Sequence, residues 1–206
     1  MTGLVLAGGL SSRFGQDKSC ITLHDAQQDM VDFSLSLLSQ LPEITDLVIS
    51  CRPEQKNAMA QKRVSVICDE KNEVPTPLNG LIAVLRRRRS PVFAIPCDLP
   101  LMTGNVLSLL MEAREKKRLS QHRVLLRTTF IDEKGFLEPT IGIYEPESLP
   151  FLEEALAQKK LGLWSAIPHE QNCLVPRPGG PAFLNMNTQE DFDLARRLIA
   201  RISPAE

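Results

Sequence analysis

The segment LVLAGGLSSRFGQDKS, residues 4–19, contains the groups that an anion-binding turn needs. A short apolar run leads into Gly8 and Gly9, and Arg13 and Lys18 follow within ten residues. Glycine lets backbone N–H groups approach an anion closely, and the two cations add fixed positive charge. The spacing fits neither a Walker loop nor a G-x-G-x-x-G dinucleotide turn. The pattern predicts a phosphate cradle, with a glycine-rich turn of no function as the alternative.

A second candidate is Asp98, which follows an apolar run and lies between Pro96 and Pro100. A carboxylate there needs a cation, because burying an isolated charge is too costly. Mg²⁺ suits it, since this ion takes one or two carboxylates and fills its other positions with phosphate oxygens and water. Asp98 lies five residues before Thr103 and is therefore too early to cap the helix expected there. Asp69, at another strand end, could accept from a ribose hydroxyl or a base N–H, or be an ordinary loop residue.

The elements that would position these residues alternate between strands and helices. Apolar runs predict strands at Gly3–Ala7, Asp46–Cys51, Val64–Cys68 and Val92–Pro96, and helical spacing predicts helices at Met30–Leu41, Pro53–Lys62, Leu78–Arg89 and Gly104–Leu119. This alternation is typical of an α/β fold, a Rossmann-like, mostly parallel sheet with helices on both faces. Ligands of such sheets bind where strands end, so the opening turn, Ser50, Asp69 and Asp98 are expected to converge.

The second half of the chain is predicted to be less regular. Strands are expected at Arg123–Phe130 and Leu137–Tyr144, joined by a turn at Asp132–Gly135, and helices at Ser148–Gln158 and Thr188–Ile202. Thr188 and Asp191 have the spacing of a capping box at the start of the last helix. Trp164 is expected to pack within this half. A chain of 206 residues can bury a sizeable core, and we expect a single domain.

Composition excludes several classes of function. Apolar residues make up 43% and charged residues 24% of the chain, and the formal net charge of -1 gives no general attraction to nucleic acid or an anionic membrane. The five cysteines are never spaced C-x-x-C, which indicates neither a disulfide framework nor a zinc site. No stretch approaches the roughly 18 apolar residues of a membrane helix, and the N-terminus lacks signal-peptide features. We therefore expect a cytoplasmic protein with no nucleic-acid or membrane partner.

Four segments, LAGGLSSRFGQDK, PCDLP, EPTIGIY and FLNMNTQED, resemble the molybdenum cofactor guanylyltransferase family of nucleotidyltransferases. Leu6–Lys18 follows the family opening L-A-G-G-x-S-x-R-x-G-x-D-K, with Phe14 where Met is usual, and the similarity covers nearly the whole chain. The resemblance implies transfer of GMP from GTP to the terminal phosphate of Mo-molybdopterin, with release of pyrophosphate. It also implies a nucleotide-binding half at 1–102 and an acceptor-side half at 103–206. Relatives that use CTP usually begin L-A-A-G, so Gly8-Gly9 favours GTP.

The resemblance further implies roles for individual residues. Arg13 and Lys18 would grip the triphosphate, Asp98 would hold Mg²⁺ between the phosphates, and Asp69 would contact the nucleoside. The remaining positions, which would border the nucleotide or lie on the acceptor side, are Leu6, Ala7, Gly8, Gly9, Ser50, Asn185 and Asn187. For the two asparagines, capping before the last helix is the alternative. No protein nucleophile is required, because the acceptor phosphate is already an anion.

Three departures from the family pattern concern substrate choice. Ser50 stands where an Asn is usual and loses the paired donor and acceptor of an amide. The usual G-P-L-A-G loop reads TPLNG, so Thr76 and Asn79 could change which base is bound. The segment HEQNCLVPRPGG shows no obvious basic pocket for a pterin, although His169, Arg177 and the glycines could contribute.

Two other functions stay open at this point. One is a nucleotidyltransferase of the same fold that uses CTP or another phosphorylated acceptor, such as a cobinamide phosphate. The other is a nucleotide-binding partner in molybdoenzyme maturation that has no turnover of its own. The presence of Arg13, Lys18 and Asp98 favours an enzyme, because a binding protein needs the triphosphate grip less than a catalyst does.

Overall fold

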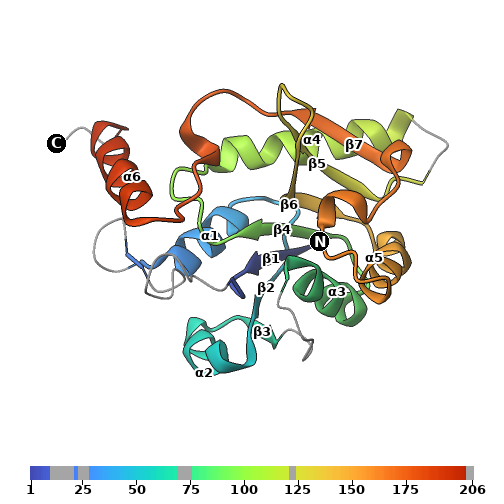
Figure 1. The fold of residues 1–206 in the computed structure, drawn as a ribbon, viewed down its shortest axis with the longest axis horizontal. Helices are drawn as coiled ribbons and strands as arrows, with labels where there is room; N and C mark the ends of the chain where they lie inside the picture. Colours follow the sequence, from blue (N-terminus) through green and yellow to red (C-terminus); the bar gives the residue numbers. More distant parts are fainter. Residues whose placement is uncertain (10–20, 23–27, 69–75, 121–123, 203–206) are drawn as a thin grey trace.

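A computed structural model describes residues 1–9, 21–22, 28–68, 76–120 and 124–202. In this part of the chain the strands form one seven-stranded sheet in the order β3-β2-β1-β4-β6-β5-β7. Figure 1 shows the sheet running from β3 at the bottom to β7 at the top, with α6 on the side where β1 and β4 end. Along the described stretches we find no helix with the length and apolar character needed to cross a membrane.

The first half forms the parallel part of the sheet. Its strands are β1 (Thr2–Leu6), β2 (Asp46–Cys51), β3 (Ser65–Cys68) and β4 (Val92–Pro96). Its helices are α1 (Met30–Ser39), α2 (Lys56–Met59), α3 (Pro77–Arg88) and α4 (Gly104–Ser120), with the 3₁₀ turns η2 (Pro53–Gln55) and η3 (Ala60–Lys62) on either side of α2. β1 pairs in parallel with both β2 and β4. The predicted Rossmann-like α/β layout is confirmed.

The second half adds one reversed strand to the sheet. Its main elements are β5 (Arg127–Ile131), β6 (Leu137–Tyr144), α5 (Leu149–Ala157), β7 (Asn172–Pro176) and α6 (Gln189–Ile202). Four 3₁₀ turns of the described residues connect them: η4 (Pro146–Ser148), η5 (Leu163–Ser165), η6 (His169–Gln171) and η7 (Pro181–Phe183). β6 is antiparallel to both β4 and β5, whereas β5 and β7 are parallel. The sheet is therefore mixed but mostly parallel.

β7 was not predicted from the sequence. The strand has only five residues, and its last residue, Pro176, is followed by a second proline at position 178. It forms by pairing with β5, from Arg127 opposite Asn172 to Ile131 opposite Pro176. β7 lies at the edge of the sheet, where a proline is tolerated because its missing N–H leaves no partner strand unpaired. β7 is therefore a strand because it pairs with β5, which is distant in the sequence, and its local sequence pattern does not indicate a strand.

Alternating side chains divide the core between the two faces of the sheet. Val5, Ile49 and Phe93 point to the face that the apolar sides of α1 and α4 cover. Their neighbours in the strands, such as Leu4 and Val48, point to the face covered by α3 and α5. Because both faces are covered, β1 after Thr2 and all of β4 lack polar side chains. Helices on both faces leave the carboxyl edge of the sheet as the place for polar groups.

Trp164 does not pack into the core, contrary to expectation. Its side chain lies in η5 and is 68% exposed, whereas the neighbouring Leu163 is 5% exposed. A Cβ atom added at Gly162 would lie 2.8 Å from the indole Nε1, so the ring lies across that glycine. The short turn can bury only one of the two adjacent side chains, and it buries the leucine.

A buried ion pair joins α4 to the end of β6. Arg114 Nε and Nη2 donate to the two carboxylate oxygens of Glu145 at 2.5 and 2.9 Å, and both residues are buried. The backbone oxygen of Glu145 also accepts the N–H and the hydroxyl of Ser148, the last residue of the turn η4 before α5. The bidentate geometry satisfies both charges where water is excluded.

We predict that Arg114→Met lowers the free energy of unfolding by about 3–5 kcal/mol, because it leaves the Glu145 carboxylate buried without its cation. The double variant Arg114→Met/Glu145→Leu should lose less than the single variant, since no charge then stays buried. Urea unfolding of both measures this. Lys116→Met on the exposed side of α4 is the control, with a change within about 0.5 kcal/mol. A double variant that is less stable than the single one would contradict the prediction.

Candidate functional site at the carboxyl edge of the sheet

The strand register brings the end of β1 between the ends of β2 and β4. Leu6 lies opposite Ser50 on one side and Pro96 on the other. The pairing continues for one more residue: Ala7 N–H donates to Ser50 O at 2.8 Å, and Cys97 N–H donates to Leu6 O at 3.3 Å. β1 and β4 are also the strands between which the strand order reverses, which is where open α/β sheets bind ligands.

Gly8 and Gly9 follow this paired end directly. Ala7 is buried, Gly8 is half-buried and Gly9 is exposed. A Cβ atom added at Gly9 would have nothing within 4 Å among the described residues, so the backbone there faces open space. Ser50, one residue before the end of β2, is buried beside Ala7, whose N–H it accepts. The two glycines therefore lie directly beyond the paired end of β1, with no described side chain against Gly9.

Three predicted site residues, Arg13, Lys18 and Asp69, lie outside the described residues. Asp69 directly follows Cys68, the last residue of β3. The roles of these three residues therefore stay predictions.

Gln55 supports the end of β1 and was not found from the sequence. Its side chain is buried, and Nε2 donates to Ala7 O at 3.1 Å. Its Oε1 accepts the backbone N–H of Arg52 at 3.1 Å. The bond from Arg52 N–H to Gln55 Oε1 has the spacing of a capping box, and that spacing can be read from the sequence. The bond to Ala7 O joins residues 48 positions apart and leaves no local signal.

Asp98 lies just past the end of β4, two residues beyond Pro96. It is half-buried, and its Oδ1 atom is shielded from solvent. Its backbone oxygen accepts the N–H of Met186 at 2.9 Å. The hydroxyl of Thr103 accepts the N–H of Val106 at 3.3 Å and so caps α4. The expectation that Asp98 is not the cap of this helix is confirmed.

The bond from Met186 brings the predicted acceptor-side asparagines to the same edge. Met186 is fully buried, and Asn185 and Asn187 on either side of it are exposed. The capping box of α6 is made by Thr188 and Asp191, as predicted: Thr188 N–H donates to Asp191 Oδ2 at 2.8 Å, and Asp191 N–H donates to the Thr188 hydroxyl at 3.2 Å. The backbone hydrogen bond between Met186 and Asp98 therefore brings this segment next to Asp98, although the two are far apart in the sequence.

A cluster of charges fixes the start of α1 near this edge. Lys62 contacts the carboxylates of both Asp29 and Asp32, and Asp29 caps α1 by accepting the N–H groups of Val31 and Asp32. Burial lowers the pKa of Lys62, but the hydrogen bonds and charges of the two aspartates outweigh it and raise that pKa above its ordinary value. Lys62 is therefore charged at neutral pH and holds η3 against α1.

Thr76 and Asn79, the two positions at which TPLNG differs from the usual family loop, lie at the start of α3. Asn79 is buried within the helix, whereas Thr76 directly precedes it. The Thr76 hydroxyl is shielded from solvent and makes no hydrogen bond to the described residues, and it does not cap the helix. These positions stay the candidates for an influence on base choice.

Within the described ranges, His, Cys, Asp and Glu side chains form no group of three or more that could hold a metal. Among the described residues, Asp98 supplies a carboxylate just past the end of β4. A single carboxylate fits Mg²⁺ when phosphate oxygens and water complete its coordination, and it does not fit zinc, which needs several protein ligands.

Comparison with known proteins agrees with this geometry. A family model described as the MobA-like NTP transferase domain matches residues 3–173. A probable molybdenum cofactor guanylyltransferase from Thermococcus kodakarensis is 25% identical over 99% of this chain and 98% of its own length. A molybdenum cofactor guanylyltransferase from Burkholderia ambifaria is 29% identical over 96% of each chain.

Among solved structures, molybdopterin-guanine dinucleotide biosynthesis protein A from Archaeoglobus fulgidus has a similar fold. The TM-score is 0.74 at 21% identity, and the match covers 98% of this chain and all of that one. At this identity the likeness shows the shared fold.

We predict that Gln55→Leu lowers the free energy of unfolding by about 1–3 kcal/mol, because Ala7 O and the Arg52 N–H lose a buried partner. Urea unfolding measures this. Gln61→Leu, on the exposed surface of η3, is the matched control and should stay within about 0.5 kcal/mol of the wild type. Equal losses in the two variants would show that Gln55 does not support the end of β1.

Proposed function

The chain belongs to the MobA-like NTP transferase domain family and is a nucleotidyltransferase, and we propose that it transfers GMP from GTP to the terminal phosphate of Mo-molybdopterin. The names of relatives that match almost the whole chain support this choice of substrates. The opening motif LAGGLSSRFGQDK supports it independently.

The observation that carries the proposal is the shared edge of β1 and β4. The register brings the end of β1, which Gly8 and Gly9 follow, beside the segment that bears Asp98, and no described atom lies within 4 Å of a Cβ added at Gly9. A glycine turn with a neighbouring carboxylate suits a nucleoside triphosphate and its Mg²⁺.

The reaction needs two anions aligned and their charge neutralised. An oxygen of the acceptor phosphate attacks the α-phosphorus of GTP, the bond from that phosphorus to the bridging oxygen breaks, and pyrophosphate leaves. Arg13 and Lys18 would hold the triphosphate and stabilise the charge that moves to pyrophosphate. Asp98 would hold Mg²⁺, which offsets phosphate charge when it is bound. The contribution of the chain is therefore positioning and electrostatics.

The remaining predicted residues divide between the two substrates. We propose that residues 1–102 bind the nucleotide through the backbone at Leu6, Ala7, Gly8 and Gly9, with Ser50 and Asp69 near the nucleoside. Residues 103–206 would bind the acceptor, with Asn185 and Asn187 beside Asp98, because Met186 N–H bonds to the backbone of that residue. Cytoplasmic location and contact with molybdoenzyme maturation proteins belong to the same proposal.

We predict that Mg²⁺-dependent binding is selective for GTP over CTP and ATP, and that Asp98→Asn weakens it at least tenfold. The loss follows from removing the carboxylate charge that holds the ion. Isothermal calorimetry with the three triphosphates, with and without Mg²⁺, measures this. Glu112→Gln on the exposed side of α4 is the control.

Either of two results would change the assignment. Selective binding of CTP would favour a cytidylyltransferase, in which Ser50, Thr76 and Asn79 account for the change of base. Failure of all three triphosphates to bind would contradict the proposed reaction.

We predict that Lys18→Ala lowers kcat/KM for GTP at least 100-fold, because the triphosphate loses a cation in the transition state. Its melting temperature should stay within about 2 °C of the wild type, since the sequence predicts that Lys18 lies in a polar turn, where a cation adds little stability. Pyrophosphate release and thermal unfolding measure the two effects, with Lys116→Ala as the exposed control. Unfolding of Lys18→Ala would show that the residue is structural.

A further inference from the structure

The segment 177–186 crosses the carboxyl edge of the sheet from β7 to β4 and is fixed at both ends. Arg177 N–H donates to Ile131 O, at the end of β5, at 2.8 Å. Met186 N–H donates to Asp98 O at 2.9 Å. The described part of the chain therefore contains a continuous connection from the proposed Mg²⁺ ligand to the far end of the sheet edge. Figure 1 shows it as the loop from β7 to η7 and onward to α6.

The guanidinium of Arg177 is held in place by two contacts. Its Nη1 donates to Glu138 Oε1 at 2.9 Å, and its central carbon lies 4.5 Å from the centre of the Phe183 ring. Phe183 is itself fixed, because it is buried and packs edge-on against Phe130 with ring centres 5.0 Å apart. A guanidinium oriented in this way loses little freedom when it binds a ligand.

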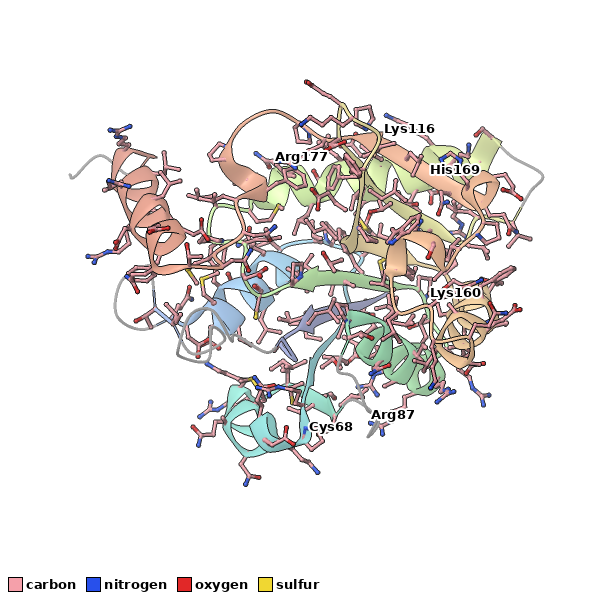
Figure 2. All side chains as sticks on the ribbon, viewed as in Figure 1. Cys68, Arg87, Lys116, Lys160, His169 and Arg177 are labelled. Atoms are coloured by element: carbon pink, nitrogen blue, oxygen red, sulfur yellow. The ribbon has the colours of Figure 1, made fainter. Side chains whose placement is uncertain are left out.

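The ion pair of Arg177 and Glu138 can form further hydrogen bonds. In the described part of the chain, the only hydrogen bond of the Arg177 guanidinium is the one to Glu138, and its side chain is 33% exposed. Gly179 and Gly180 follow in the same segment, and Cβ atoms added there would meet nothing described within 4 Å. Figure 2 shows Arg177 where β7 passes into this loop. A ligand therefore has room to approach.

The position of the pair sets the length of the ligand. β7 lies three strands from β4 in the sheet order. At about 4.8 Å per strand, the end of β7, which Arg177 follows, lies roughly 14 Å from the end of β4 along the edge, whereas Glu138 lies in β6, the strand next to β4. A phosphorylated heterocycle whose phosphate lies near Asp98 could extend that far.

The chemistry of the pair defines what it would recognise. A guanidinium donates to a carbonyl or ring nitrogen, and a carboxylate accepts from a ring N–H or an amino group. Burial raises the pKa of Glu138, although the charge of Arg177 lowers it. A further hydrogen-bond donor would therefore stabilise the charged carboxylate. The edge of a pterin offers an amino group, an N–H and a carbonyl side by side, which matches a carboxylate next to a guanidinium.

We propose that Glu138 and Arg177 form the site for the heterocyclic end of the acceptor, with Glu138 accepting from its N–H groups and Arg177 donating to its carbonyl oxygen. This assignment rests on the proposed function, because it takes the acceptor to be a phosphorylated pterin. The two residues position the acceptor and take no part in bond making.

The test uses a free pterin, 6-hydroxymethylpterin, as a fluorescent probe that carries no phosphate. Fluorescence titration should show that Arg177→Gln and Glu138→Gln each raise its Kd at least tenfold. In the transfer assay with the molybdopterin acceptor, the same variants should raise the acceptor KM at least tenfold and leave the GTP KM within twofold. Arg86→Gln and Glu153→Gln remove an ion pair of similar exposure at the opposite edge and should change neither value.

The outcomes separate this inference from the proposed function. Wild-type transfer with unchanged acceptor KM and probe Kd in both variants would overturn the Glu138–Arg177 site alone. Failure of the wild type to transfer GMP would contradict the proposed function, while probe binding would still report on the site. Arg177→Lys keeps the charge but lacks the planar fork, so it should show the weakened probe binding without loss of folding. A wild-type Kd in Arg177→Lys would also count against the site.

Discussion

The hydrogen-bond ladder that holds β1 between β2 and β4 is the interaction on which the rest of the structure depends. It sets Leu6 level with Ser50 and Pro96, and therefore sets where Gly8 and the segment of Asp98 leave the sheet. A slip of one residue in a strand would turn its apolar side chains from one covered face to the other, so the two core layers fix the register. The geometry of the proposed nucleotide site is thus a consequence of core packing on both faces.

The reversed strand β6 explains how the second half reaches the same edge. Because β6 is antiparallel to β4 and β5, its first residues lie at the edge where the parallel strands end. Glu138, near the start of β6, can therefore meet Arg177, just past the end of β7. At the other end of β6, the buried pair of Glu145 and Arg114 fixes the strand to α4. The reversed strand therefore brings Glu138 to the same edge of the sheet at which β4, β5 and β7 end.

Much of the first half could be predicted from the sequence because its signals are local. Apolar runs and helical spacing located β1, β2, β4, α1, α3 and α4. What could not be predicted depends on contacts between distant residues. Gln55 bonds to Ala7 48 positions away, and Arg177 pairs with Glu138 39 positions away. β7 exists as a strand only through β5, and Trp164 is exposed because a short turn buries its neighbour instead.

The two halves differ in how well the sequence predicts them because their proposed sites use different kinds of groups. A phosphate cradle is made mainly by backbone N–H groups and a few cations in one turn, so its residues are close in sequence. Recognition of a heterocycle needs side-chain donors and acceptors at set positions around it, and several strands must supply them. Here β6, β7 and the segment 177–186 bring such groups together, and the bond from Met186 to Asp98 ties them to the other half. The two substrates of a transfer reaction can thus be held by different structural means on one rigid edge, which fixes the distance between them.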